Sequence, residues 1–179
     1  MNIYKYDIYR NYGFYKENIR QKLSRPDGLK YLKIYRKVNE SKSNIIKMWY
    51  RYKLSRLSRK TFIQIPYSTK IGKGLYIGHN GPVIINPNSI IGDNCNIATG
   101  VTIGQENRGK RKGCPTIGNE VWIGTNAVIL GNIKIGNDVL IAPLSYVNFD
   151  VPDHSIVIGN PAKIIHRDNA TEGYINRKV

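Results

Sequence analysis

The sequence is poor in cysteine, histidine and acidic residues. Its 179 residues include two cysteines, three histidines and twelve acids, against 28 lysines and arginines. Two cysteines cannot build a disulfide-rich scaffold, and their settings, Cys95 at an inward position and Cys114 in a polar loop, favour reduced thiols. The histidines, His79, His154 and His166, do not have the spacing of zinc ligands. We therefore expect no metal.

Long apolar runs are also missing. The first thirteen residues contain no apolar segment of the kind found in signal peptides. No stretch approaches the roughly 18 consecutive apolar residues that a membrane-spanning helix needs. We therefore expect a cytoplasmic protein.

Positive charge is concentrated in the first third of the chain. Residues 1–60 hold seventeen Lys and Arg against four acids, a net charge of +13, together with nine of the thirteen tyrosines. Apolar residues at helical spacing, such as Phe14, Tyr15, Ile19 and Leu23, predict helices there, with a break at residues 26–28.

Two interpretations of this basic region stay open. Its aromatic residues could pack helices against the rest of the chain, with Lys and Arg forming a solvated face. Alternatively, the region could make a peripheral contact with the anionic inner face of a membrane. No nucleic-acid-binding motif is present, so we expect no nucleic-acid partner.

An aliphatic residue recurs at every sixth position between Ile71 and Val147, as in Ile91-Gly92, Ile97-Ala98 and Ile103-Gly104. A period of six turns successive residues by 600° around a helix, which scatters them over three faces. Three extended segments joined by bends can use this period, because they close a triangular coil. The pattern predicts a mainly β fold, a parallel β-helix of stacked coils, and evenly spaced strands of a sandwich are the alternative.

A second inward position follows each aliphatic residue by four. Alternation along a strand turns both positions toward the interior of the coil. The predicted second set is Leu75, Ser89, Cys95, Val101, Val121, Ala127, Ile133, Val139 and Ser145.

The repeat is interrupted twice. Two extra residues fall near 80–82, and eight extra residues fall between Ile103 and Ile117. The second interruption predicts a polar loop, residues 105–116, that protrudes from the coil. Composition and repeat together divide the chain into a helical region at 1–60, the β-helix at 61–166 and a polar, mobile tail at 167–179.

Several motifs in the repeat region are specific. They are the run from Gln64 to His79, Val101-Thr102-Ile103-Gly104, Cys114-Pro115-Thr116-Ile117-Gly118 and Gly159-Asn160-Pro161-Ala162-Lys163. Together they resemble the hexapeptide-repeat acyltransferases, within these the serine acetyltransferase branch and its relatives in polysaccharide biosynthesis. The resemblance covers residues 46–166. It implies a left-handed parallel β-helix, a homotrimer with active sites between subunits, and acetyl-CoA as co-substrate.

His79 lies where the resemblance places the catalytic base. A neutral imidazole can take a proton from an alcohol, whereas the alternative for an isolated surface histidine is a solvated side chain. One coil later the stacked position is Thr99. The resemblance also implies contacts with the donor along a groove between coils, at Gly104, Thr125, Ala142, Asn148 and Lys163.

The motifs depart from the serine-specific pattern at four positions. Serine-specific members have aspartates in place of Gln64 and Gly78, and an Arg-His pair in place of Gly113-Cys114. Those groups hold the charged ends of serine, and their loss weakens discrimination strongly. We therefore expect the acceptor to be a sugar hydroxyl of a surface polysaccharide or its precursor, presented as a glycan, a nucleotide sugar or a lipid-linked sugar.

The expected acceptor site combines two of these positions with the residue stacked on His79 and one residue of the polar loop. It consists of Gln64, Thr99, Arg108 and Cys114. Cys114 as a nucleophile is disfavoured, because transfer in the resembling family is direct. Two alternatives to the sugar acetyltransferase are a serine O-acetyltransferase of cysteine biosynthesis and a non-catalytic hexapeptide-repeat scaffold.

Overall fold

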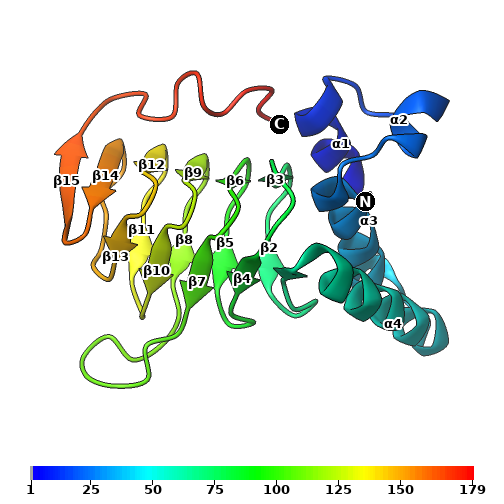
Figure 1. Cartoon of the computed structure of the whole chain (residues 1–179), viewed down its shortest axis with the longest axis horizontal. Helices are drawn as coiled ribbons and strands as arrows, with labels where there is room; N and C mark the ends of the chain where they lie inside the picture. The colour runs from blue at the N-terminus through cyan, green and yellow to red at the C-terminus, as the bar shows by residue number, and fades with distance from the viewer. Residues whose placement is uncertain (1) are drawn as a thin grey trace.

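Short parallel strands wind into a triangular β-solenoid in the computed structural model, which describes residues 2–179 (Figure 1). Sheet A consists of β1 (Ile63–Gln64), β4 (Val83–Ile85), β7 (Thr102–Gly104), β10 (Val128–Leu130) and β13 (Tyr146–Val147). Sheet B consists of β2 (Lys70–Ile71), β5 (Ile90–Ile91), β8 (Thr116–Ile117) and β11 (Lys134–Ile135). Sheet C consists of β3 (Tyr76–Ile77), β6 (Asn96–Ile97), β9 (Val121–Ile123), β12 (Val139–Ile141), β14 (Ser155–Gly159) and β15 (Ala162–His166). The predicted mainly β fold of stacked parallel coils is confirmed, and β15 closes the stack by pairing antiparallel with β14.

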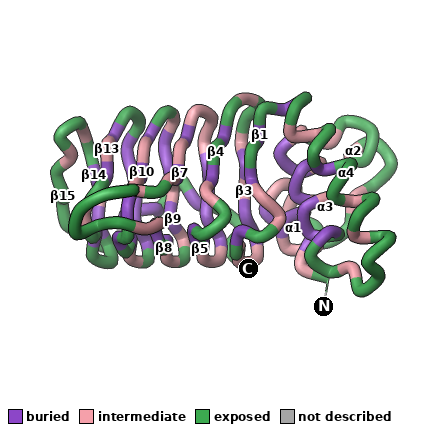
Figure 2. Tube along the Cα trace, turned by 90° about the horizontal axis from the view of Figure 1, so that it is seen from below, coloured by how far each residue is buried: buried purple, intermediate pink, exposed green. Residues whose placement is uncertain are grey.

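The register shows how the coil absorbs both interruptions of the repeat. Along sheet C, Ile77 pairs with Ile97, Ile97 with Ile123, and Ile123 with Ile141. These steps are 20, 26 and 18 residues long, so the extra residues leave the stacking intact. Buried residues recur in every coil (purple in Figure 2), and their side chains form one continuous core cluster. All nine residues of the predicted second inward set are buried, including Ser89 and Ser145.

Side-chain amides and carboxylates bridge successive coils at the bend between sheets B and C. The backbone N–H groups of Asp93, Asn119 and Asn137 each donate to the side-chain oxygen one coil further on, at 2.8, 2.8 and 2.7 Å. The last acceptor is Asp153. Bends cannot pair as strands do, and this ladder satisfies amides that strand pairing leaves free.

Four helices precede the coil: α1 (Tyr4–Tyr12), α2 (Ile19–Leu23), α3 (Asp27–Glu40) and α4 (Asn44–Thr61). The expected helix through Phe14 and Tyr15 is not formed. Gly13, with a φ of 78°, caps α1, so Phe14 and Tyr15 lie exposed in the connection to α2. The break at residues 26–28 is where α3 begins, with Pro26 at its N-cap position.

Helix α3 packs its aromatic residues against the first coil. Tyr31, Leu32 and Tyr35 are buried, and the Tyr31 hydroxyl donates to the Ile65 carbonyl at 2.8 Å. The packing interpretation therefore holds for α3. Helix α4 instead leaves Trp49 and Tyr52 exposed. No helix within residues 2–179 is long and apolar enough to cross a membrane, and the membrane contact stays a prediction without further support.

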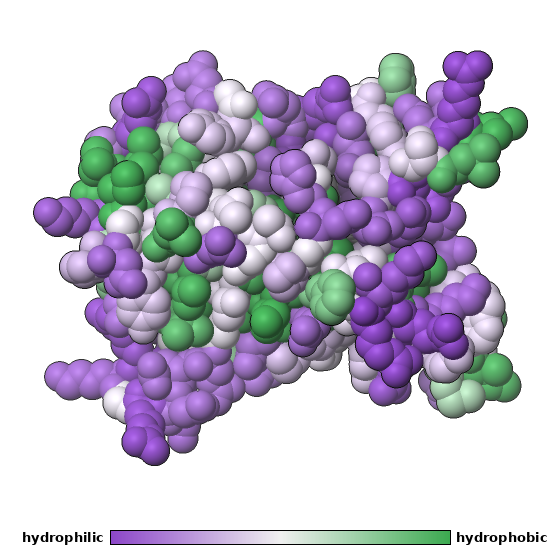
Figure 3. Space-filling view, in the orientation of Figure 1, coloured by the Kyte–Doolittle hydropathy of each residue, from purple (hydrophilic) through white to green (hydrophobic). Residues whose placement is uncertain are grey.

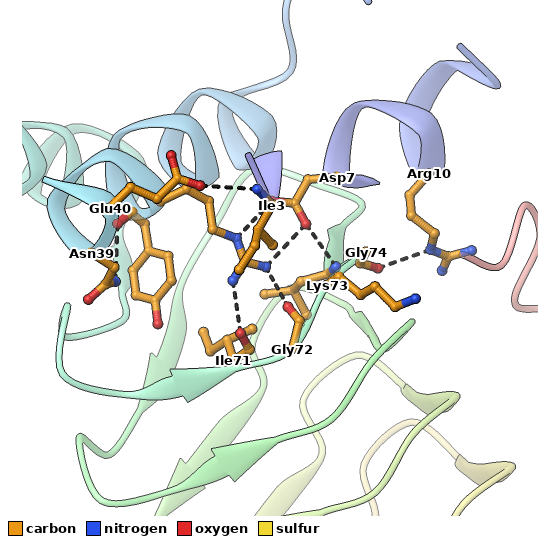
Figure 4. A network of polar contacts seen from close by, with 12 residues as sticks. Ile3, Asp7, Arg10, Asn39, Glu40, Ile71, Gly72, Lys73 and Gly74 are labelled. Carbon is orange, nitrogen blue, oxygen red and sulfur yellow. Dashed lines mark hydrogen bonds and ion pairs between the residues drawn. The ribbon is translucent and has the colours of Figure 1, made fainter. Parts of the chain in front are cut away.

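A buried ion pair joins the helices to the coil (Figure 4). Arg36 on α3 donates to both carboxylate oxygens of Asp7 on α1, at 2.9 and 3.2 Å. The same guanidinium donates to the carbonyls of Ile71 and Gly72, and Asp7 accepts the Leu75 N–H at 3.1 Å. Two helices and the first coil therefore share one polar network.

The C-terminal tail is packed along the coil, which differs from the expected mobile segment. It runs from β15 back over the edge of sheet C, and its end lies beside α1 (Figure 1). Ala170 and Thr171 are buried, and their N–H groups donate to the Asp138 carboxylate at 2.9 and 3.0 Å. Near the end, the Val179 N–H and carbonyl both bond the Asn94 side chain at 2.9 Å. These bonds anchor the tail together with the burial of Ala170 and Ile175.

Removing the carboxylate of Asp7 should destabilise the fold strongly. Asp7→Ala leaves the Arg36 guanidinium buried without its counter-charge, and we expect the free energy of unfolding to fall by about 3–5 kcal/mol. Urea denaturation followed by circular dichroism measures the change. The control Asp27→Ala removes an acid whose partner Lys30 is partly exposed, and should cost about 1 kcal/mol or less. Equal losses in the two variants would contradict the role of this pair.

Docking of the tail should depend on pH through Asp138. Burial alone would raise the pKa of Asp138, but hydrogen bonds from Thr171, His154 and the backbone of Thr171 and Ala170 outweigh burial and lower it to about 2. A lowered pKa stabilises the docked tail above the ordinary value of 3.8, and this stabilisation is lost as the pH falls toward 2. Amide hydrogen exchange at residues 170 and 171, corrected for intrinsic rates, should therefore accelerate between about pH 4 and pH 2.

The matched variants separate this effect from general acid unfolding. Asp138→Asn should expose the two amides already at neutral pH, with little further change on acidification. Asp168→Asn, which alters an exposed carboxylate of the same segment, should behave as the wild type. Unchanged protection in Asp138→Asn would rule out the proposed anchor.

Candidate active site

His79 lies at the corner where the chain passes from sheet C to sheet A. One residue, Gly78, separates His79 from the end of β3, and the His79 side chain is exposed. It borders a hollow of about 170 Å³. Within residues 2–179 no hydrogen bond orients the imidazole, which leaves both ring nitrogens free to meet a ligand. The hollow is also lined by Tyr76, Gly78, Asn96, Ile97, Ala98, Trp122 and Thr125.

The first interruption of the repeat shapes this corner. Gly81 has a φ of 135°, and a Cβ built there would collide with the Thr99 hydroxyl oxygen. Glycine is therefore required twice, by its backbone conformation and by the close approach of Thr99. The predicted stacking of His79 over Thr99 agrees with the register, in which Ile77 pairs with Ile97. Gly81 brings Thr99 up to the turn that carries His79.

The polar loop emerges from the opposite edge of sheet A, where the chain turns toward sheet B. Glu106 and Gly113 bridge its two arms, and its outer part projects as the hydrophilic lobe at the lower left of Figure 3. The Cys114 thiol lies 3.2 Å from the Asn86 side-chain oxygen, and Arg111 donates to the Asn148 carbonyl. Arg108 is exposed on the loop. Burial raises the pKa of the Cys114 thiol, which disfavours the thiolate that nucleophilic attack requires.

The predicted acceptor residues do not meet within one subunit. Thr99 belongs to the His79 corner, whereas Cys114 and Arg108 belong to the loop on the other side of sheet A. Strand β7, which crosses sheet A, separates residue 99 at one edge from residue 105 at the other. Gln64 lies in neither group and lines a separate cavity of about 400 Å³ beside α4.

The predicted donor contacts are similarly divided. Thr125 lines the His79 hollow, and Gly104 and Asn148 lie at the loop edge. Lys163 is exposed on β15 at the end of the coil. Ala142 is buried under the tail, and its N–H and carbonyl already pair with Val157 and Ser145, so a donor contact there would compete with these bonds. Their roles stay predictions.

Sequence reasoning did not identify three outward-facing side chains that line the hollow. Tyr76, Asn96 and Trp122 occupy equivalent outward positions on neighbouring strands of sheet C, paired in register. Each stands immediately before a repeat aliphatic, Ile77, Ile97 or Ile123. That shared position was the available signal, because it places the three side chains on one face beside the His79 corner.

The comparisons agree with this geometry. A family model described as bacterial transferase hexapeptide (six repeats) matches residues 114–148. A serine acetyltransferase of Synechococcus elongatus is 41% identical over 115 residues, which cover 64% of this chain and 47% of the relative. A serine acetyltransferase of Helicobacter pylori is 42% identical over 116 residues, covering 64% of this chain and 68% of the relative. The solved structure of a Brucella abortus serine acetyltransferase in complex with coenzyme A has a TM-score of 0.73 and 27% identity. The match covers 92% of this chain and 66% of that structure's chain.

The parallel solenoid and these matches define a hexapeptide-repeat transferase. More narrowly, the chain belongs to the serine acetyltransferase family. It spans less than half the length of the Synechococcus relative.

The expected sugar acceptor, and with it a place in polysaccharide biosynthesis, is wrong, because the relatives at 41–42% identity are serine acetyltransferases. The expectation rested on the charged groups lost at the four departing positions. The loop that carries Gly113 and Cys114 also carries four cations, a source of positive charge to which the expectation gave too little weight. These cations are Arg108, Lys110, Arg111 and Lys112.

Adding a methyl group at Gly81 should disturb the His79 corner. Gly81→Ala combines a disfavoured positive φ with the collision against Thr99, and we expect a loss of about 2 kcal/mol or more in stability. Gly109→Ala is the matched control, because Gly109 also has a positive φ but has no atom within 4 Å of the added carbon.

The double variant Gly81→Ala/Thr99→Ala isolates the collision. It removes the Thr99 hydroxyl and leaves the Thr99 Cβ at an ordinary 3.4 Å from the new carbon. We expect it to recover part of the stability lost in Gly81→Ala, measured by thermal unfolding and referred to Thr99→Ala alone. No recovery would mean that backbone strain accounts for the whole effect.

Proposed function

We propose that this chain is an acetyl-CoA-dependent serine O-acetyltransferase that uses His79 as its general base. The observation that carries the proposal is an exposed imidazole, free of partners among the described residues, at a corner hollow of a hexapeptide-repeat solenoid. The relatives named serine acetyltransferase support serine as acceptor, and the Brucella abortus complex supports coenzyme A as the carrier.

The proposed reaction is a direct transfer. His79 takes the proton of the serine hydroxyl while its oxygen attacks the thioester carbonyl of acetyl-CoA. The carbon–sulfur bond then breaks, and the imidazolium returns the proton to the departing CoA thiolate. Backbone N–H groups at the glycine-rich turn around Gly81 are suited to stabilise the oxyanion. The raised pKa of Cys114 supports a route without an acyl-cysteine intermediate.

A homotrimer would complete the site. Within one subunit the His79 corner and the basic loop lie at opposite edges of sheet A, with β7 between them. Two subunits packed side by side can place the His79 corner of one against the loop of the next. We propose that the loop cations then face the serine carboxylate or the phosphates of the donor.

Replacing His79 should abolish turnover and preserve the fold. CoA release from acetyl-CoA and L-serine, followed with a thiol reagent, should fall about 10²–10⁴-fold in kcat for His79→Asn. His154→Asn is the matched control, because His154 has a φ of 55°, which asparagine tolerates. It should retain kcat within about twofold. Wild-type turnover in His79→Asn would refute the assignment, and so would the absence of serine-dependent CoA release by the wild type.

Mixed oligomers test the shared site. We expect a variant whose loop cations Arg108, Lys110, Arg111 and Lys112 are all changed to serine to be as inactive as His79→Asn. Co-refolding the two inactive chains should restore activity, because some interfaces then combine an intact corner with an intact loop. Failure of any mixture to recover activity, with trimers confirmed by light scattering, would place both elements in one subunit.

A further inference from the structure

A second polar cavity lies where the two ends of the chain meet the coil. It measures about 380 Å³ and is bounded by α1, by the outer face of sheet C and by the C-terminal tail. Its walls include Arg10, Asn11, Tyr76, Asn96, Tyr174 and Arg177. Such a volume falls in the range of small-molecule sites.

Arg10 is a buried cation without a carboxylate partner. The residue exposes 5% of its surface to solvent. Its guanidinium donates to the Gly74 carbonyl at 3.0 Å and to the Asn96 side-chain oxygen. Both partners are neutral. None of the ion pairs formed within residues 2–179 includes Arg10. A buried charge without a counter-charge is costly, so this position favours an anion.

The nearby acids are already engaged. Asp7, one turn earlier on α1, is paired with Arg36, and Glu120 is paired with Lys178. The Arg10 guanidinium therefore keeps unused N–H donors on the side that faces the tail, toward the red ribbon of Figure 4. A guanidinium has five N–H donors in a planar fork, of which two are accounted for by Gly74 and Asn96.

Arg177 adds a second positive charge to the same cavity. It donates to the Asn11 carbonyl at 2.7 Å, which holds it over the end of α1. Burial first, and to a lesser extent the charge of Arg177, lower the pKa of Arg10. Two arginines facing one polar cavity repel each other, and an oxyanion between them would relieve that repulsion.

We propose that this cavity binds a small oxyanion, a phosphate or carboxylate group, that locks the C-terminal tail onto α1 and the coil. The ligand would accept hydrogen bonds from Arg10 and Arg177, which belong to opposite ends of the chain. Tyr76 and Tyr174 leave room for a small organic body beside the charged group. The site is distinct from the His79 hollow, although Tyr76 and Asn96 line both.

Tryptophan fluorescence of the full chain tests the proposal. The ring centroids of Trp122 and of Tyr174 in the tail are 4.9 Å apart. The chain has two tryptophans, so Trp49→Phe leaves Trp122 as the single fluorescent tryptophan. Sodium phosphate and sodium succinate are titrated separately against sodium chloride at constant ionic strength. We expect a saturable change with at least one of them. Saturation by phosphate alone would identify a phosphate group as the ligand chemistry, and saturation by succinate alone would identify a carboxylate.

Three substitutions decide whether the cavity is responsible. Arg177→Gln should weaken binding about tenfold, since it removes a charge-assisted contact. Arg167→Gln removes the same charge from an exposed residue at the start of the tail that does not line the cavity, and should change the Kd less than about twofold. Asn176→Asp, nearly isosteric, adds a negative charge to the cavity wall and should abolish binding.

The overturning results are equally specific. The proposal fails if neither anion gives a saturable change at constant ionic strength. It also fails if Arg177→Gln and Arg167→Gln weaken binding equally, which would indicate general charge screening, or if Asn176→Asp binds as the wild type does.

Discussion

Parallel stacking of the coils is the constraint on which the rest of the structure depends. Each coil offers its backbone groups to the next and its Ile and Val side chains to a shared interior. Residues can be added only where they leave both unchanged, at the bends. The two interruptions obey this rule, since pairing along sheet C continues through steps of 20 and 26 residues. The extra residues form the His79 corner and the basic loop, the two places where the solenoid departs from pure repetition.

The inward repeat could be predicted from the sequence because it depends on a period, which many residues report independently. Even the polar members Ser89 and Ser145 are buried as predicted. The junction with the helices could not be predicted in this way. It depends on single polar contacts, such as Asp7 with Arg36 and Leu75, between residues far apart in the chain. No local pattern distinguishes such residues from the surrounding solvated charges.

The candidate site was predicted in part for the same reason. The period placed His79 over Thr99, because stacking follows directly from counting residues. The break in the period located the basic loop but gave no information on its conformation, because its eight extra residues have no partner one coil away. The prediction that the tail is mobile failed on a related point. Its composition is polar, but a single acceptor, Asp138, binds two of its amides and the Thr171 hydroxyl.

The tail and the helices together make sheet C different from sheet A. Tyr174 packs against Trp122, and Asn96 donates to the Tyr174 carbonyl at 3.0 Å, so the tail covers much of the outer face of sheet C. Ile84 on sheet A remains exposed. A solenoid with one covered face can meet a neighbouring subunit most readily through its uncovered faces. The His79 corner and the loop flank sheet A. Sheet A is therefore an uncovered face that also joins the two elements of the candidate site.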